Sequence, residues 1–169
     1  MWLFDINPSA YQHIGNLLNQ SKDRESLRAL SPLSPEQVEQ IGSLKGEAIL
    51  GFITGETLSL EYFSPNKVFK DFTQTVIAAE APKDSELQTA ALEQQAGWLY
   101  IIDNRVADLE REETSPEDIL GVFEIKDGRI VANSYQPNEN YLLFGNNGLM
   151  QLPASLHESL IKALESLSD

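Results

Sequence analysis

The sequence predicts an α+β fold, with an antiparallel sheet built from hairpins and helices packed on one face. One observation is Asp127-Gly128, which lies between two β-forming runs and favours a type I′ hairpin turn. Another is Thr54-Gly55, which also separates runs rich in apolar residues. Strand and helix segments do not alternate along the chain, so a Rossmann or TIM architecture is excluded. The 169 residues fit a single domain spanning 1–169.

Two helix starts are indicated in the first quarter of the chain. Asn7-Pro8 supplies a capping residue and a proline suited to the first helical position. The apolar stripe of this first helix would be Tyr11, Ile14, Leu17 and Leu18. Residues 22–31 lack a clear pattern and are expected to form an irregular or weakly helical connection. Ser34-Pro35-Glu36-Gln37 combines a capping box with proline at the first helical position, so a short helix should begin there.

Residues 48–63 have the pattern of a hairpin around Thr54-Gly55. Its second strand is indicated by Leu58, Leu60 and Tyr62, which alternate with polar residues. The following segment, 67–77, mixes a helical apolar spacing with β-favouring residues. We expect a short helix there, followed by an extended stretch.

The second half of the chain gives clearer signals. A helix should start at Asp84 or Ser85 and stop before Gly97, and the apolar run 98–102 should be a central strand. Residues 122–131 should form the hairpin around Asp127-Gly128, and the pattern of residues 141–152 predicts another hairpin. Pro153 opens a last helix, whose buried stripe would be Leu156, Leu160, Ile161, Leu164 and Leu167.

The charge of the chain restricts its partners. Lys and Arg number 12 against 26 Asp and Glu, which gives a net charge of −14. Nucleic acids and anionic membranes are therefore not expected as partners, because binding to them depends on basic residues. The acidity serves either solubility or a protein with a basic surface. The first residues do not resemble a signal peptide, and no apolar run approaches the roughly 20 residues of a membrane span, so a cytoplasmic location is expected.

Familiar catalytic and cofactor motifs are missing from the sequence. The chain contains no cysteine, no glycine-rich phosphate loop and no G-x-S-x-G elbow. Its histidines, His13 and His157, stand alone without the spacing of metal ligands. We therefore predict no catalytic residues, no metal and no cofactor, and an enzyme is the less favoured interpretation. The sequence gives no prediction of oligomeric state.

The segment 103–118 concentrates the negative charge. It carries seven acidic residues against Arg105 and Arg111. A solvated, mobile loop is the simplest interpretation, and docking to a basic partner is the second. The docking candidates are Asp108, Glu110, Glu112 and Glu113. A Ca²⁺ or Mg²⁺ site is the least favoured, because no EF-hand pattern and no glycine occur in this stretch.

Aromatic residues suggest a second candidate site. Trp98 and Tyr100 alternate along the predicted strand, and Tyr135 and Tyr141 flank a polar loop that contains Asn138. If these strands are neighbours, the rings could line a groove for a small molecule or a peptide, with Asn138 as a polar contact. Packing in the core or at a sheet edge is the alternative explanation.

Three stretches of the second half form a common pattern: Gly97–Asp103, Pro116–Gly128 and Ser134–Asn138. These stretches resemble small conserved cyanobacterial proteins of unknown function. The resemblance implies a bacterial protein and brings no functional residue. The sequence thus favours a non-catalytic cytoplasmic interaction or regulatory domain, with a ligand-binding protein or an unfamiliar enzyme as the alternative.

Overall fold

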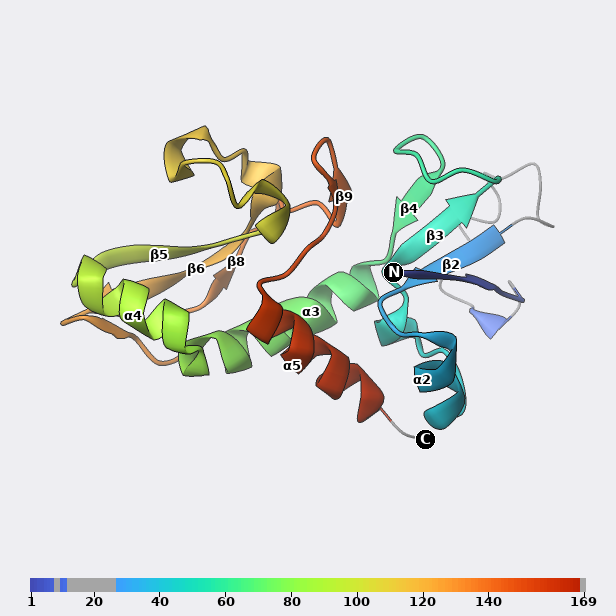
Figure 1. The fold of residues 1–169 in the computed structure, drawn as a ribbon, viewed down its shortest axis with the longest axis horizontal. Helices are drawn as coiled ribbons and strands as arrows, with labels where there is room; N and C mark the ends of the chain where they lie inside the picture. Colours follow the sequence, from blue (N-terminus) through green and yellow to red (C-terminus); the bar gives the residue numbers. More distant parts are fainter. Residues whose placement is uncertain (8–9, 12–26, 168–169) are drawn as a thin grey trace. The chain divides into compact units, whose positions relative to one another are not determined.

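The computed structural model describes residues 1–7, 10–11 and 27–167 (Figure 1). The chain divides into two compact units, which we describe separately. Unit 1 comprises Met1–Phe72 and Ile161–Asp169, and unit 2 comprises Thr73–Leu160. A single domain over 1–169 stays a prediction. The helix predicted after Asn7-Pro8 has most of its length outside the described residues.

Unit 1 contains a four-stranded antiparallel sheet in the order β1-β2-β3-β4. The strands are β1 (Trp2–Asp5), β2 (Leu27–Ser31), β3 (Gly51–Thr54) and β4 (Phe63–Pro65). Phe4, Ala29 and Phe52 lie opposite one another across three strands. They belong to a cluster around the buried residues Leu27, Ala29, Ile49 and Phe52. One face of this sheet therefore supplies an apolar core.

The short helix α2 (Pro35–Gln40) confirms the predicted capping box. The Ser34 hydroxyl accepts a bond from the Gln37 backbone, and the Gln37 side chain accepts one from the Ser34 backbone. This exchange satisfies two N–H groups that the first turn leaves free. A 3₁₀ turn, η4 (Gly46–Ala48), then leads into β3.

Two predictions about where the strands of unit 1 lie were wrong. Leu27–Ser31 is a strand where an irregular connection was expected, because hydrogen bonds to both β1 and β3 decide its conformation. Residues 58–62 are not a strand, and Leu58, Leu60 and Tyr62 are exposed. The partner of β3 begins only at Phe63, so the alternating residues before it lie in the connecting loop.

Helix α3 (Lys67–Glu80) is continuous where an extended second half was predicted. Phe69, Thr73, Val76 and Ile77 are buried at helical spacing. Packing of this stripe outweighs the weak strand preference of the β-branched residues. The helix starts in unit 1 and continues into unit 2.

In unit 2, the end of α3 is followed by a 3₁₀ turn, η5 (Ala81–Lys83), and by helix α4 (Ser85–Gln94). Asp84 caps α4 by accepting a bond from the Leu87 backbone, as expected. Strand β5 (Gly97–Ile102) pairs with β6 (Ile119–Lys126), which also pairs with β7 (Arg129–Ile130) and β8 (Gln136–Pro137). The prediction that β5 is central was wrong, because β6 occupies the middle and takes partners on both sides.

The remaining hairpins and the last helix confirm their predictions. Asp127 and Gly128 have φ values of 52° and 71°, which a type I′ turn requires. β9 (Phe144–Gly145) and β10 (Gly148–Leu149) form the second hairpin. Helix α5 (Ala154–Glu165) buries Leu156, Leu160 and Leu164 of the predicted stripe, whereas Ile161 and Leu167 are half-buried. The helix ends in unit 1.

The antiparallel α+β class is confirmed, although the strands form separate sheets instead of one. No helix among the described residues has the length and apolar character needed to cross a membrane. Three further 3₁₀ turns lie between β5 and β6: η6 (Asn104–Val106), η7 (Arg111–Glu113) and η8 (Pro116–Asp118).

Candidate functional site

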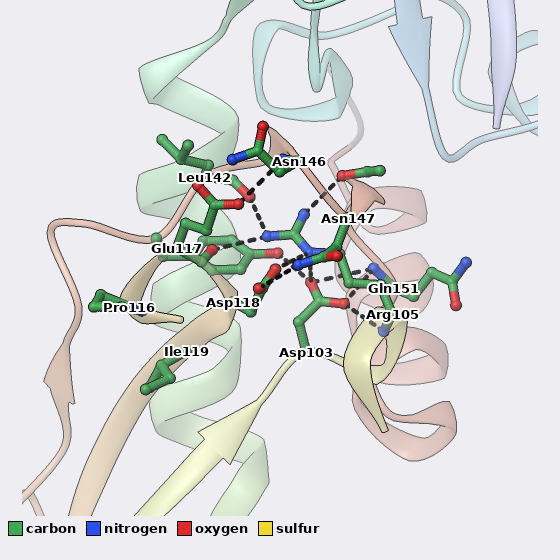
Figure 2. Close-up of polar contacts among 12 residues, drawn as sticks. Asp103, Arg105, Pro116, Glu117, Asp118, Ile119, Leu142, Asn146, Asn147 and Gln151 are labelled. Carbon is green, nitrogen blue, oxygen red and sulfur yellow. Dashed lines mark hydrogen bonds and ion pairs between the residues drawn. The ribbon is translucent and has the colours of Figure 1, made fainter. Parts of the chain in front are cut away.

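The loop between β5 and β6 is held at both ends by buried charged side chains (Figure 2). Asp103 follows β5 directly, Arg105 lies in η6, and Asp118 ends η8 just before β6. The Arg105 side chain is 1% exposed and the side chains of Asp103 and Asp118 are 0% exposed. We call these three residues the clasp. Their burial shows that the two ends of this loop are folded structure.

The Arg105 guanidinium uses its planar set of donors almost completely. Its Nε donates to Asp118 Oδ1 at 2.7 Å. Its terminal nitrogens donate to the carbonyl oxygens of Gly148 at 3.0 Å, Glu117 at 2.8 Å and Leu142 at 2.8 Å. Arginine suits such a position because its fork presents several fixed N–H groups and retains its charge. Arg105 therefore ties both ends of the loop to the segment that carries the β9–β10 hairpin.

Asp103 links β5 to the segment that follows β10. Its carboxylate accepts bonds from the Tyr141 hydroxyl at 2.6 Å, the Arg105 backbone at 2.9 Å and the Gln151 backbone at 3.0 Å. The Gln151 carbonyl in turn accepts a bond from the Asn104 backbone at 2.7 Å. This buried carboxylate is thus fully engaged in hydrogen bonds, as buried polar groups usually are.

Asp118 completes the clasp on the β6 side. Its Oδ2 accepts a bond from the Asn147 side chain at 2.9 Å, while Oδ1 faces Arg105. Two carboxylates therefore share one guanidinium in a buried cluster, and neutral donors complete the coordination of both. Within the described residues, no three His, Cys, Asp or Glu side chains are arranged to hold a metal ion. The arrangement is suited to fixing a loop.

Burial is the largest influence on the pKa of Asp103 and on the pKa of Tyr141. It raises the pKa of Asp103 above its ordinary value of 3.8, although hydrogen bonds from Tyr141, the Arg105 backbone and Gln151, and the positive charge of the Arg105 guanidinium, oppose the shift. Burial also raises the pKa of Tyr141 above its ordinary value of 10.0, and the neighbouring Asp103 charge adds to the effect. Tyr141 therefore stays protonated and donates its hydrogen bond throughout the neutral range.

The raised pKa of Asp103 predicts a specific pH dependence. Native Asp103 binds a proton more readily than unfolded Asp103, so protonation favours the native state. The free energy of unfolding of the wild type, measured relative to Asp103→Asn, should rise as the pH falls through the raised pKa. It should level off below 3.8, the ordinary pKa. Urea titrations from about pH 7 to about pH 3 check this difference, and a constant difference would contradict it.

The middle of the loop, Ala107–Glu113, is solvent-exposed. We call it the acidic tip. It contains the four predicted docking residues, Asp108, Glu110, Glu112 and Glu113, and the single base Arg111. The described residues form no ion pair with any of the four. The tip therefore presents concentrated negative charge, and the clasp fixes the two ends of the loop that carries it.

Arg111 folds back from the tip onto the sheet. Its guanidinium carbon lies 3.6 Å from the centroid of the Tyr100 ring. Leu99 and Ile101 are buried on one face of β5, so Tyr100 lies on the opposite face, which we call the outer face. The contact is a cation–π interaction between the acidic tip and the outer face of the sheet.

Trp98 lies on the outer face, two residues before Tyr100. Trp98 is 45% exposed, and Glu124 lies directly opposite it on β6. Cross-strand neighbours of this kind have Cβ atoms about 5 Å apart, so their side chains can share a ligand. Trp98 and Tyr100 are thus brought together as predicted from their spacing.

The other three residues of the predicted aromatic site occupy different surroundings. Tyr135 packs on Phe123 with ring centroids 4.8 Å apart, and Phe123 lies opposite the buried Leu99. The Tyr135 hydroxyl donates to the Gln74 side chain, and burial raises the pKa of Tyr135 above its ordinary value of 10.0. The Tyr135 ring therefore lies on the inner face of the sheet, away from Tyr100.

Tyr141 and Asn138 serve the loop structure. Tyr141 is 1% exposed and bonds to Asp103. The Asn138 side chain donates to the Pro116 carbonyl at 2.7 Å and the Ile119 carbonyl at 2.8 Å. These bonds hold η8 against β6. The structure thus separates the five predicted ligand-binding residues into an outer pair and three that make internal contacts.

Sequence reasoning missed Arg105 as the organising residue. It was counted only as a charge that offset the acids around it. The available signal was its position, since an arginine three residues after an apolar strand and among carboxylates is a candidate for internal pairing. Of the two histidines, His13 lies outside the described residues and His157 lies on α5.

Comparisons with known proteins gave no relative. No protein-family model matches the chain, and neither the curated proteins nor the solved structures contain a match.

Proposed function

We propose that this protein is a non-catalytic interaction or regulatory domain of the bacterial cytoplasm that docks a protein with a basic surface. The observation that carries the proposal is the clasp. It fixes both ends of the loop with buried hydrogen bonds, while four carboxylates at the tip stay exposed. Charged residues on a fixed support favour rapid and selective encounter with an oppositely charged partner.

The charge of the whole chain supports the same class of partner. At −14, it repels nucleic acid and anionic lipid surfaces. Three buried ionisable residues of unit 2, Asp103, Arg105 and Asp118, hold the loop between β5 and β6. These residues are buried, so they are not free to act on a substrate. This supports docking over catalysis.

A capture experiment tests the proposal. The variant Glu110→Gln, Glu112→Gln, Glu113→Gln removes most of the charge of the tip and keeps side-chain size. We expect it to lose basic partners that the wild-type chain retains from a bacterial cytoplasmic extract at low salt. Raising the salt concentration should release the same partners from the wild type, because exposed charge pairs are screened.

A matched control keeps the total charge change equal. Glu86→Gln, Glu93→Gln, Glu158→Gln removes three exposed carboxylates from α4 and α5. This control should retain the partners. If the tip variant and the control give identical partner sets, docking through the acidic tip is wrong.

The alternative function is binding of a small molecule or a peptide at the aromatic residues. One observation favours part of it: Trp98 is exposed beside Tyr100 on the outer face. Tyr135, Asn138 and Tyr141 make internal contacts, so any such site depends on the outer pair.

A further inference from the structure

The outer face of β5 already holds a guanidinium group. Arg111 stacks on Tyr100 at 3.6 Å, although it belongs to a segment with acidic neighbours on both sides. A guanidinium next to Glu110 and Glu112 could pair with carboxylates, yet it lies over a ring. The Tyr100 face is thus a position that accepts arginine.

The surface continues beyond Tyr100 with the features of a second such position. Trp98 presents an exposed ring, and tryptophan is the side chain that binds cations most strongly through its face. Glu124 lies opposite Trp98 and supplies a carboxylate. Lys126 and Arg129 lie near the Asp127-Gly128 turn and carry positive charge. The negatively charged end of this surface is therefore the end near the acidic tip.

We infer that the outer face at Trp98 and Tyr100 binds arginine side chains of a basic partner, and that Arg111 occupies the Tyr100 position in the free protein. The inference rests on the proposed docking function and specifies the chemistry of the partner. The acidic tip supplies long-range attraction, and the rings supply the preference for arginine. Arg111 then acts as an internal competitor that the partner must displace.

The chemistry favours arginine over lysine. A guanidinium is planar, stacks on aromatic faces and is less strongly hydrated than an ammonium group. Carboxylates alone attract both cations, so a preference for arginine is the signature of the rings. A partner that binds only to the tip should show little such preference.

Titration calorimetry of the full chain with defined peptides tests the inference. The probes are a peptide of alternating arginine and glycine and its lysine counterpart of equal length. The arginine peptide should bind more tightly. Tyr100→Leu and Trp98→Leu should each weaken it by roughly two- to fivefold, while Tyr100→Phe, which keeps a ring face, should leave it unchanged.

A double-mutant cycle isolates the competition by Arg111. Arg111→Ala should tighten the arginine peptide by roughly two- to fivefold in the wild-type background and by less in the Tyr100→Leu background. The charge change is the same in both backgrounds, so the difference measures the ring contact.

The outcomes separate this inference from the proposed function. Equal gains from Arg111→Ala in both backgrounds, or equal affinity for the two peptides, would overturn the inference. If the tip variant still loses both peptides in that case, docking through the tip survives. If neither peptide binds to the wild-type chain, both the inference and the proposed docking function are contradicted.

Discussion

Replacing Arg105 with methionine should lower the free energy of unfolding of unit 2 by about 3–5 kcal/mol, the usual cost of removing one partner from a buried ion pair. The change leaves Asp118 and Asp103 buried without their cation. It also removes the donors to the carbonyl oxygens of Gly148, Glu117 and Leu142. Unsatisfied buried acceptors add to the loss.

Urea denaturation followed by tryptophan fluorescence measures this loss. The chain has two tryptophans, Trp2 in unit 1 and Trp98 in unit 2, so the Trp2→Phe background reports unit 2 alone. Arg111→Met is the matched control, because Arg111 is exposed, and should change stability by less than about 1 kcal/mol. A loss below about 1 kcal/mol for Arg105→Met would show that the clasp does not stabilise the unit.

The second large effect is expected from Gly121→Ala in β6. A Cβ at this position would lie 2.5 Å from the Tyr135 hydroxyl oxygen and 2.6 Å from the Gln136 carbonyl oxygen. The second contact is with the backbone of the paired strand β8, which cannot move without losing its hydrogen bonds to β6. Overpacking of this kind costs about 1–3 kcal/mol, and the backbone contact places Gly121→Ala toward the upper end.

The same fluorescence assay, in the Trp2→Phe background, measures the cost of Gly121→Ala. Gly145→Ala is a suitable comparison, because its closest neighbour would be the flexible end of Glu117 at 3.1 Å. That variant should cost less than Gly121→Ala. Equal and small losses for the two variants would mean that β8 does not approach β6 as closely as described.

Local chemistry explains which elements were predictable from sequence. The capping box at Ser34 and the turn at Asp127-Gly128 depend on residues close in sequence, and both were predicted correctly. The strand at Leu27–Ser31 depends on pairing with β1 and β3, so its own residues carry little signal. The helical state of Thr73–Ile77 also depends on packing that outweighs local preference.

The candidate site shows the same division. The exposed acids of the tip and the outer pair Trp98 and Tyr100 follow from composition and strand alternation. The clasp does not, because Arg105 meets Gly148 and Leu142 only after unit 2 has folded. Identical aspartates in one acidic stretch therefore have different roles, with Asp103 and Asp118 buried and Asp108 exposed.

Amide hydrogen exchange resolved along 103–118 tests the central claim most directly. If the clasp holds the loop, the amides of Asp103, Asn104, Arg105 and Gln151 should exchange slowly, because each donates to a bonded acceptor within the clasp region. The amides of the acidic tip should exchange much faster. Uniformly fast exchange from 103 to 118 would contradict the account, because the whole segment would then be a solvated, mobile loop.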